Sequence, residues 1–250
     1  MTKHAEPVMG TVVSLRVVSS EPQEVIAAAI RAACAELHQA DALFSTWNPH
    51  SPVSRLRRAE SALDDLPSEV EEVLGLCAAA REVTDGWFDP WAAPGGVDPT
   101  GLVKGWAVAR ALAVMQEAGL TAAMVNGGGD IAVCGEPPGQ PGGWRIGIRH
   151  PWRPDGLAAI IANVTSAVAT SGRYERGHHL YSPAGRPAAA VASATVTGPS
   201  LAMADAFATA LAVGGDEVMP LIGALDGYGA YLIRADGTEA ETGGIAFAQA

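Results

Sequence analysis

The sequence predicts an α+β fold in which an antiparallel-rich sheet packs against helices. Three features predict it: a β-branched run near the start, long segments with apolar residues at helical spacing, and a later series of short strand-like runs. Turn residues separate those runs at short intervals, which favours hairpins over crossover connections. No repeat, low-complexity stretch or linker divides the chain, so we expect a single domain over residues 1–250.

The first strand is expected at 11–18, "TVVSLRVV", which is rich in β-branched residues. Apolar residues then recur at helical spacing, which predicts an amphipathic helix over 23–44. The segment that follows, "FSTWNPHSPVSRLR", is expected to be a loop because it contains Asn-Pro and Ser-Pro pairs.

Two more helices are expected before residue 122, where the pattern changes to short strands. One begins near Ser68, which forms a capping-box pattern with Glu71, and it ends at Asp85-Gly86. The next covers about 102–118 and stops at Gly119.

The second half is expected to be mostly short strands, with helical segments near the end. The last helices should cover 200–215 and a short stretch near 216–225, before a final strand at 228–235. The strands before them are expected at 122–126, 130–135, 144–150, 157–164 and 192–198.

The composition limits the classes of partner and compartment. Twenty-seven acidic against sixteen basic residues give a net charge of −11, which argues against a nucleic-acid or anionic-membrane surface. The three cysteines have no paired spacing for zinc or for a disulfide framework, which favours a reducing compartment. No leader pattern or apolar run of about 18 residues is evident, so we expect a cytoplasmic protein with no membrane anchor.

Asp205 and Thr209 are the polar side chains of the otherwise apolar stretch "ADAFATALAV" at 204–213, and they share one helix face. A buried carboxylate needs pairing, hydrogen bonds or a metal, and these oxygens suit magnesium beside a phosphate. A purely structural interpretation remains open. Asp205 lies near the helix N-terminus, where the dipole favours it, and Thr209 can bond to a carbonyl one turn earlier.

The segment "RYERGHHLYSPAGRP" (173–187) contains adjacent histidines between turn residues. Histidine titrates near neutrality and is the commonest general base. At most one of two adjacent side chains would face a site if the segment is extended. A solvent-exposed or structural role is the alternative.

Two further motifs are less specific. The glycines of "VNGGGDIAVCG" (125–135) allow either close approach to a ligand or a tight hairpin. The aromatic residues of "GWFDPW" (86–91) suit a planar heterocycle or an ordinary core.

The stretch "GVDPTGLVKGWAVAR" (96–110) approaches the Gly-rich phosphate loop without completing it. That loop requires its lysine directly after the second glycine, whereas Leu102 and Val103 separate Gly101 from Lys104.

In chain order, nine motifs resemble those of the FAD:protein FMN transferases, the ApbE family. They run from Met9 to about Gly215 and read "VMGTVVSL", "FSTWNPHSPVSRL", "GWFDPW", "GVDPTGLVKGWAV", "VNGGGDIAVCG", "WRIGIRHP", "ATSGRY", "HHLYSPAGRP" and "MADAFATALAVGG". The resemblance implies an α+β, T-fold-like architecture with a flavin cleft. It also implies a Mg²⁺-dependent transfer of FMN from FAD to a Ser/Thr hydroxyl of an acceptor protein, with release of AMP.

The resemblance also implies roles for individual residues. Gly101, through its backbone oxygen, Asp205 and Thr209 would bind magnesium, and His179 would be the catalytic base. The residues that would contact FAD are Met9, Trp47, Trp87, Phe88, Asp89, Asp98, Lys104 and Leu180.

Three residues depart from the family pattern. Trp47 replaces a tyrosine and keeps a stacking surface without the phenol. Ser182 replaces an aspartate near His179, and Ala208 stands where some members carry a second carboxylate. Two other functions therefore stay open: a Mg²⁺-dependent FAD diphosphatase and a non-catalytic FAD-binding protein.

Overall fold

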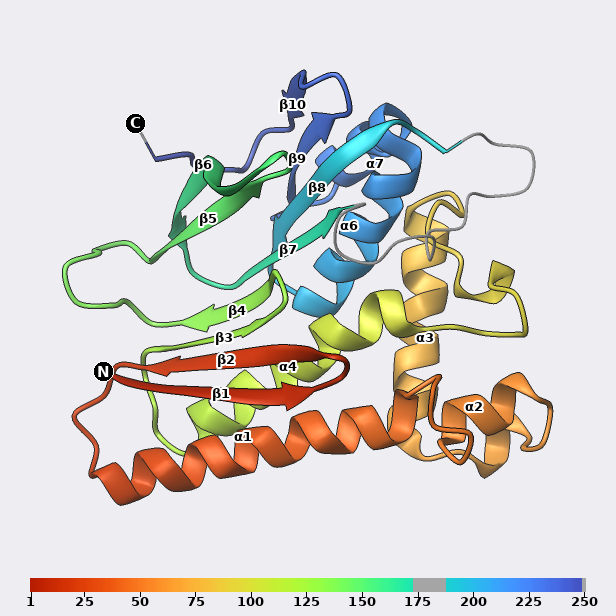
Figure 1. Ribbon diagram of the computed structural model, residues 1–250, viewed down its shortest axis with the longest axis horizontal. Helices are drawn as coiled ribbons and strands as arrows, with labels where there is room; N and C mark the ends of the chain where they lie inside the picture. The colour runs from red at the N-terminus through yellow and green to blue at the C-terminus, as the bar shows by residue number, and fades with distance from the viewer. Residues whose placement is uncertain (173–187, 249–250) are drawn as a thin grey trace.

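The computed structural model describes residues 1–172 and 188–248. Its main feature is an eight-stranded sheet in the order β1-β2-β3-β4-β7-β8-β9-β10, with every neighbouring pair antiparallel (Figure 1). The strands are β1 (Thr2–Val8), β2 (Thr11–Val17), β3 (Ala123–Gly127), β4 (Asp130–Cys134), β7 (Ala167–Gly172), β8 (Val191–Gly198), β9 (Gly229–Arg234) and β10 (Glu239–Glu241).

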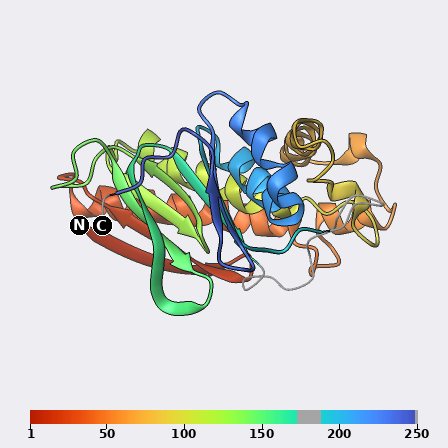
Figure 2. The same cartoon turned by 90° about the horizontal axis from the view of Figure 1, so that it is seen from above.

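Helices cover one face of this sheet (Figure 2). Those that contact the strands are α1 (Gln23–Phe44), α4 (Thr100–Glu117), α6 (Leu201–Gly214) and α7 (Met219–Gly223). Beyond the strand ends, α2 (Pro52–Arg57) packs against α1, and α3 (Ser68–Val83) packs against α4 and α6. Short 3₁₀ turns lie at Leu63–Asp65, Pro90–Ala92 and Gly215–Glu217. Leu15 of β2, Leu37 of α1 and Phe207 of α6 belong to the core between helices and sheet.

A second sheet, the hairpin β5 (Trp144–His150) and β6 (Arg153–Val164), packs on the other face. Because successive strand residues point to opposite faces, β4 sends Ala132 towards the helices and Ile131 and Val133 towards the hairpin. The sheet is therefore buried on both sides in its middle.

The predicted fold class is confirmed, and most elements lie where the sequence places them. The helix predicted over 23–44 has those bounds, and Gly119, with a φ of 86°, follows the end of α4. The glycine run forms a tight hairpin, in which Gly128 and Gly129 have φ values of 66° and 99°.

Three elements were not predicted. β1 pairs with β2 from Thr2↔Val17 to Val8↔Thr11, but its exposed, mostly polar residues lack the pattern of a buried strand. The small residues of β7 and the three residues of β10 gave no strand signal either.

Two local predictions were wrong. The loop predicted after residue 44 contains α2, because the Ser51 hydroxyl accepts a hydrogen bond from the Ser54 amide and Pro52 begins the helix. The capping box at Ser68 does not form, since Pro67 is the N-cap and the Ser68 hydroxyl hydrogen-bonds to Glu69.

Within the described ranges 1–172 and 188–248, no helix has the length and apolarity needed to cross a bilayer.

Candidate active site

The end of α3 positions the first part of the site. Asp85 and Gly86 adopt φ values of 49° and 78°, and the Gly86 amide donates to the Arg81 carbonyl at 2.8 Å, which closes the helix and turns the chain. The buried Thr84 hydroxyl donates to the Ala80 carbonyl and accepts the Phe88 amide at 3.1 Å. This turn therefore fixes the backbone that carries Trp87 and Phe88.

Asp89 is held by two hydrogen bonds. Its Oδ1 accepts the Trp91 amide at 3.0 Å, and its Oδ2 accepts from Nε of Arg81 at 2.8 Å. Its negative charge is thus partly compensated before any ligand arrives.

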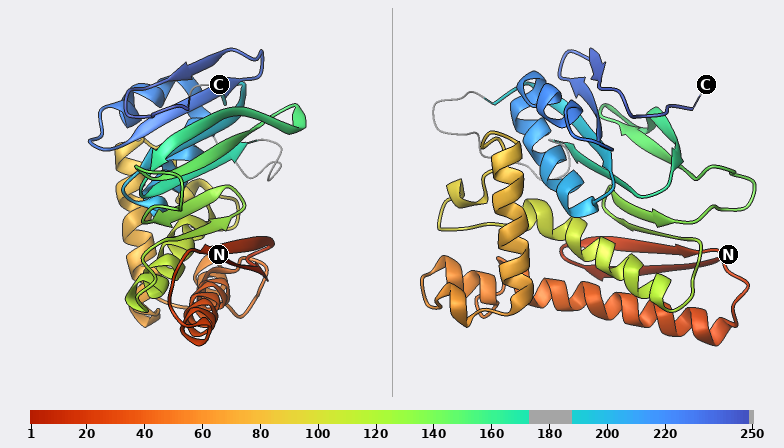
Figure 3. Two further views of the ribbon diagram at one scale, coloured as in Figure 1. Left: turned by 90° about the vertical axis from the view of Figure 1, so that its left-hand side faces the viewer. Right: turned by 180° about the vertical axis from the view of Figure 1, so that it is seen from behind.

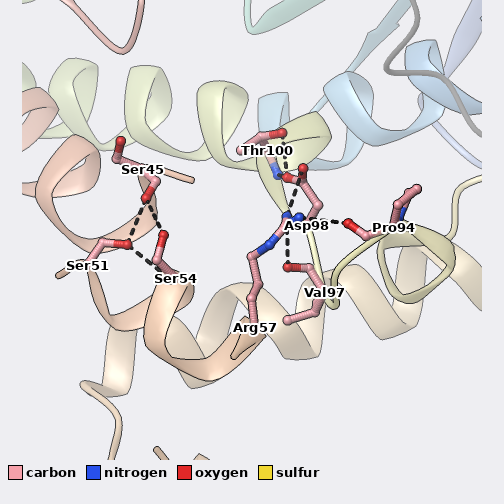
Figure 4. Close-up of polar contacts among 8 residues, drawn as sticks. All are labelled: Ser45, Ser51, Ser54, Arg57, Pro94, Val97, Asp98 and Thr100. Atoms are coloured by element: carbon pink, nitrogen blue, oxygen red, sulfur yellow. Dashed lines mark hydrogen bonds and ion pairs between the residues drawn. The ribbon is translucent and has the colours of Figure 1, made fainter. Parts of the chain in front are cut away.

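Asp98 is also held by hydrogen bonds and by an arginine (Figure 4). Its Oδ1 accepts both the amide and the hydroxyl of Thr100, at 3.1 and 2.7 Å, where α4 begins. Its Oδ2 lies 3.1 Å from Nη1 of Arg57. Arg57 also donates to the carbonyls of Val97 and Pro94, so one guanidinium ties α2 to the loop before α4.

A group of serines fixes the chain just before α2 (Figure 4). The hydroxyls of Ser51 and Ser54 donate to the Ser45 carbonyl at 2.7 and 3.0 Å. The segment they close carries Trp47, whose side chain is exposed (89%).

Helices α4 and α6 meet at two glycines of α4. A Cβ on Gly101 would lie 3.3 Å from the Thr209 hydroxyl, and one on Gly105 would lie 2.8 Å from Cβ of Asp205. The Gly105 amide donates to Oδ2 of Asp205 at 2.9 Å, across 100 residues of sequence. The structure therefore brings together Gly101, Asp205 and Thr209, as the sequence analysis expected.

The Gly105–Asp205 hydrogen bond gives Asp205 a partner on the neighbouring helix, in addition to its place near the N-terminus of its own helix. The side chain is buried (3% exposed), and the hydroxyl that caps its own helix is that of Ser200. Its carboxylate faces the neighbouring helix, where an ideal α-helix would direct the Gly105 amide to the Gly101 carbonyl.

Lys104 of α4 lies between this helix crossing and the start of β4. Its ammonium group pairs with the fully buried Asp130 at the start of β4 and lies 4.0 Å from Oδ1 of Asp205. Asp130 directly follows the Gly128–Gly129 turn. The backbone before the turn passes close to α4, since a Cβ on Gly127 would lie 2.8 Å from Val108.

Six of the predicted residues line one small hollow: Trp87, Phe88, Asp89, Asp98, Gly101 and Thr209. Four other predicted residues, Met9, Trp47, Lys104 and Asp205, are not among its described lining. Met9 occupies the β1–β2 turn with a φ of 53°, and Lys104 and Asp205 are buried beside the α4–α6 crossing. His179 and Leu180 lie outside the described residues. The hollow, about 60 Å³, is far smaller than typical ligand pockets of about 300–1,000 Å³, so it would enclose only part of a dinucleotide.

A larger hollow of about 350 Å³ lies elsewhere, lined by Arg16, Trp144 and Arg145 among others. Its described lining offers no carboxylate, and it contains none of the predicted site residues. The chemistry-bearing groups therefore favour the smaller hollow.

Cys77 of α3 is buried close to the site. Burial raises the pKa of its thiol to about 12, and the negative charges of Asp98 and Asp205 contribute to the rise. Since the thiolate is the reactive form, Cys77 does not supply a nucleophile at neutral pH.

Sequence reasoning missed Arg57, Arg81 and Thr84. Arg57 pairs with a residue about forty positions later, and Arg81 with one on the far side of a helix end. Nothing in the local sequence distinguishes Arg57 or Arg81 from surface arginines.

Comparison with known proteins gives consistent results. The model of a family described as the ApbE family matches residues 9–96 and 93–232. The chain is 36% identical over 152 residues to a FAD:protein FMN transferase of Rhodobacter capsulatus. That match covers 57% of this chain and 29% of the relative, so it spans less than a third of the relative's length.

Solved structures share the fold across nearly the whole chain. The ApbE protein of Thermotoga maritima and the flavin transferase ApbE of Vibrio cholerae superpose with TM-scores of 0.82 and 0.81, and both are 22% identical. Each match covers 97% of both chains. The apo flavinyl transferase ApbE of Pseudomonas stutzeri gives a TM-score of 0.78 at the same identity, covering 97% of this chain and 95% of its own.

Proposed function

The chain belongs to the ApbE family, and we propose that it is a flavin transferase that moves FMN from FAD to a Ser/Thr hydroxyl of an acceptor protein. In this reaction the acceptor oxygen forms a bond to the FMN phosphorus, the diphosphate bond breaks, and AMP leaves. The 36% identical relative is named for FMN transfer from FAD, which supports this assignment.

The observation that carries the proposal is the close packing, at the α4–α6 crossing, of residues that carry three oxygen donors. Gly101 and Thr209 are in contact, and Asp205 faces α4 one turn earlier on α6. A carboxylate, a hydroxyl and a backbone carbonyl form the donor set of a hard cation such as Mg²⁺.

The hydrogen bond of Asp205 supports the same donor set. Because the Gly105 amide donates to Asp205, it competes with the helical bond that would otherwise engage the Gly101 carbonyl. When bound there, Mg²⁺ would neutralise charge on the diphosphate of FAD.

The surrounding charges allow a diphosphate to approach an acidic protein. Asp89 and Asp98 already have arginine partners, and Lys104, which pairs with Asp130, lies 4.0 Å from Oδ1 of Asp205. The aromatic side chains of Trp87 and Phe88, which line the same hollow, would contact the flavin ring.

His179 is proposed as the base that takes the proton from the acceptor hydroxyl. A hydroxyl is a weak nucleophile until it is deprotonated, and a positioned base typically contributes about 10²–10⁴-fold. Met9, Trp47 and Leu180 are proposed as further FAD contacts on the family resemblance alone. A cytoplasmic location, in a reducing compartment, is proposed because the three cysteines have no paired spacing for zinc or for a disulfide framework.

The proposal is tested by incubating the protein with FAD, Mg²⁺ and a candidate acceptor, and measuring the acceptor's mass. We expect one FMN to be added per acceptor, and none when the target Thr or Ser is replaced by alanine. A His179→Ala variant should still bind FAD but transfer at least about 10²-fold more slowly.

The same incubation without acceptor distinguishes the alternatives. Steady release of FMN and AMP at the rate seen with acceptor would identify a diphosphatase. FAD that stays bound and intact with every acceptor would identify a binding protein.

A further inference from the structure

Four side chains with metal-binding chemistry meet on the molecule's edge, between β1 and α1. His4 and Glu6 come from β1, and Cys34 and His38 come from α1. Nε2 of His4 lies 3.0 Å from Oε2 of Glu6, and Nε2 of His38 lies 2.8 Å from its Oε1. The ligand atoms of His4, Glu6 and Cys34 all lie within 4.8 Å of one another.

The periodicity of the two elements explains this meeting. Residues two apart on a strand share a face, as do residues four apart on a helix. His4 and Glu6 therefore point together towards α1, while Cys34 and His38 point together towards β1. Figure 3 shows α1 running alongside the β1–β2 hairpin at one end of the sheet.

We propose that His4, Glu6 and Cys34 bind one Zn²⁺ ion, with water as a fourth ligand and with His38 hydrogen-bonded to the second oxygen of Glu6. Imidazole, thiolate and carboxylate are all zinc ligands, and thiolate is not a ligand for Mg²⁺. A hydrogen bond from His38 would orient the carboxylate, as partners of metal-bound groups commonly do.

The geometry requires only a small adjustment. Ligand atoms of a tetrahedral zinc site lie about 3.3–3.8 Å apart, given bonds of about 2.0–2.3 Å. The present separations, up to 4.8 Å, therefore need to close by about 1 Å. β1 is an edge strand and the His4 side chain is 39% exposed, so His4 has room to move.

Binding involves proton release and no redox step. The S–H bond of Cys34 breaks, a S–Zn bond forms, and the proton passes to solvent. Nε2 of His4 donates its proton to Glu6 in the metal-free protein. That proton leaves to solvent, or moves to Nδ1 where Nδ1 is unprotonated, so that Nε2 binds the metal and the ring keeps one proton on Nδ1.

This site is separate from the one proposed for Mg²⁺. None of its four residues is among the described lining of the hollow beside Gly101 and Thr209. Zinc here would join the exposed edge of the sheet to α1 and would act on stability without entering the transfer reaction.

Cobalt(II) is a suitable probe because a thiolate–cobalt bond gives a charge-transfer absorption in the near ultraviolet. The full chain, freed of metal by a chelator and then saturated with Mg²⁺, would be titrated with Co²⁺ and afterwards with Zn²⁺. We expect one equivalent of Co²⁺ to produce the band and Zn²⁺ to remove it.

Variants assign the band to the cluster. Cys34→Ser should abolish the band, and His4→Ala, on an exposed strand, should weaken Co²⁺ binding at least tenfold. Cys134→Ser and His50→Ala change a thiol and an imidazole outside the cluster and should behave as the wild type. Zinc should raise the urea midpoint of the wild type and not that of Cys34→Ser.

Absence of the band in the folded wild type would overturn the proposal, as would a band that survives in Cys34→Ser. Equal Co²⁺ affinity of His4→Ala and wild type would also overturn it. In each case the cluster would be a set of hydrogen bonds around Glu6 only. FMN transfer is measured independently, so failure of this proposal leaves the transferase assignment unaffected.

Discussion

At the scale of single residues, the carboxylates of the site differ in whether they are paired with an arginine. Asp89 and Asp98 are each paired with an arginine at about 3 Å. Asp205 instead accepts one backbone amide and keeps Oδ1 4.0 Å from Lys104. This difference is consistent with the proposed roles, in which Asp89 and Asp98 contact FAD and Asp205 binds a cation.

Arg57 is expected to act by positioning Asp98. Its planar fork reaches Asp98 and two backbone carbonyls at once, which a lysine cannot reproduce. Arg57→Lys should raise the KM for FAD about tenfold, since a hydrogen bond to a charged group contributes about 1.5–3 kcal/mol. The value of kcat should change little.

Steady-state kinetics with varied FAD would measure this effect, and Arg55→Lys on the same helix provides the control because its side chain is exposed. An unchanged KM in Arg57→Lys would show that the arginine only stabilises the fold.

The sequence predicted some of these residues and not others for a physical reason. Asp205 and Thr209 stand out as polar groups on an apolar helix, so the local sequence marks them as candidates, and the resemblance to the family supplies their proposed role. Arg57 and the pair Cys34 and His4 depend on partners brought close by tertiary structure, and short spacing patterns do not reveal them.

At the scale of elements, the close crossing of α4 and α6 organises the site. Gly105 allows it, because a Cβ there would come within 2.5 Å of the Leu201 carbonyl oxygen. The amide of the same residue holds Asp205. Helix packing and the orientation of the proposed metal ligand therefore depend on one position.

Gly105→Ala should force the two helices apart. We expect it to lower the free energy of unfolding by about 1–3 kcal/mol, as overpacking does, and to raise the Mg²⁺ concentration needed for transfer. Gly75→Ala in α3 is the matched control, since a Cβ on Gly75 would meet no atom within 4 Å.

Gly75→Ala should leave stability unchanged or raise it by about 0.5–1 kcal/mol through helix propensity. Urea unfolding of both variants measures the difference. A Gly105→Ala protein as stable as Gly75→Ala would contradict the close crossing.

Elements with a strong periodic pattern were predicted well, and those without one were not. α1 follows its apolar spacing and α6 its continuous apolar run, whereas β1 carries mostly polar exposed residues and β7 mostly small ones. Pairing with β2 and β8 makes them strands, and such pairing depends on distant parts of the chain.

At the scale of the whole molecule, the antiparallel sheet is a platform buried on both faces in its middle. The helices on one face carry the proposed transfer site, and the hairpin β5–β6 covers the other. The stretch "GVDPTGLVKGWAVAR" is not a phosphate loop. Its lysine, Lys104, lies one turn inside α4 and pairs with Asp130.

The central claim is that Gly101, Asp205 and Thr209, which come from two distant helices, together bind the cation required for transfer. The most direct test is to titrate Mg²⁺ against the rate of FMN transfer in the wild type and in Asp205→Asn. Asparagine keeps an oxygen to accept the Gly105 amide but removes the charge, so the fold should be retained.

We predict that Asp205→Asn raises the half-saturating Mg²⁺ concentration at least about tenfold, since charged contacts contribute about 1.5–3 kcal/mol. Asp216→Asn, which alters an exposed carboxylate paired with Arg234, should leave the titration unchanged. Identical Mg²⁺ titrations for Asp205→Asn and the wild type would contradict the account.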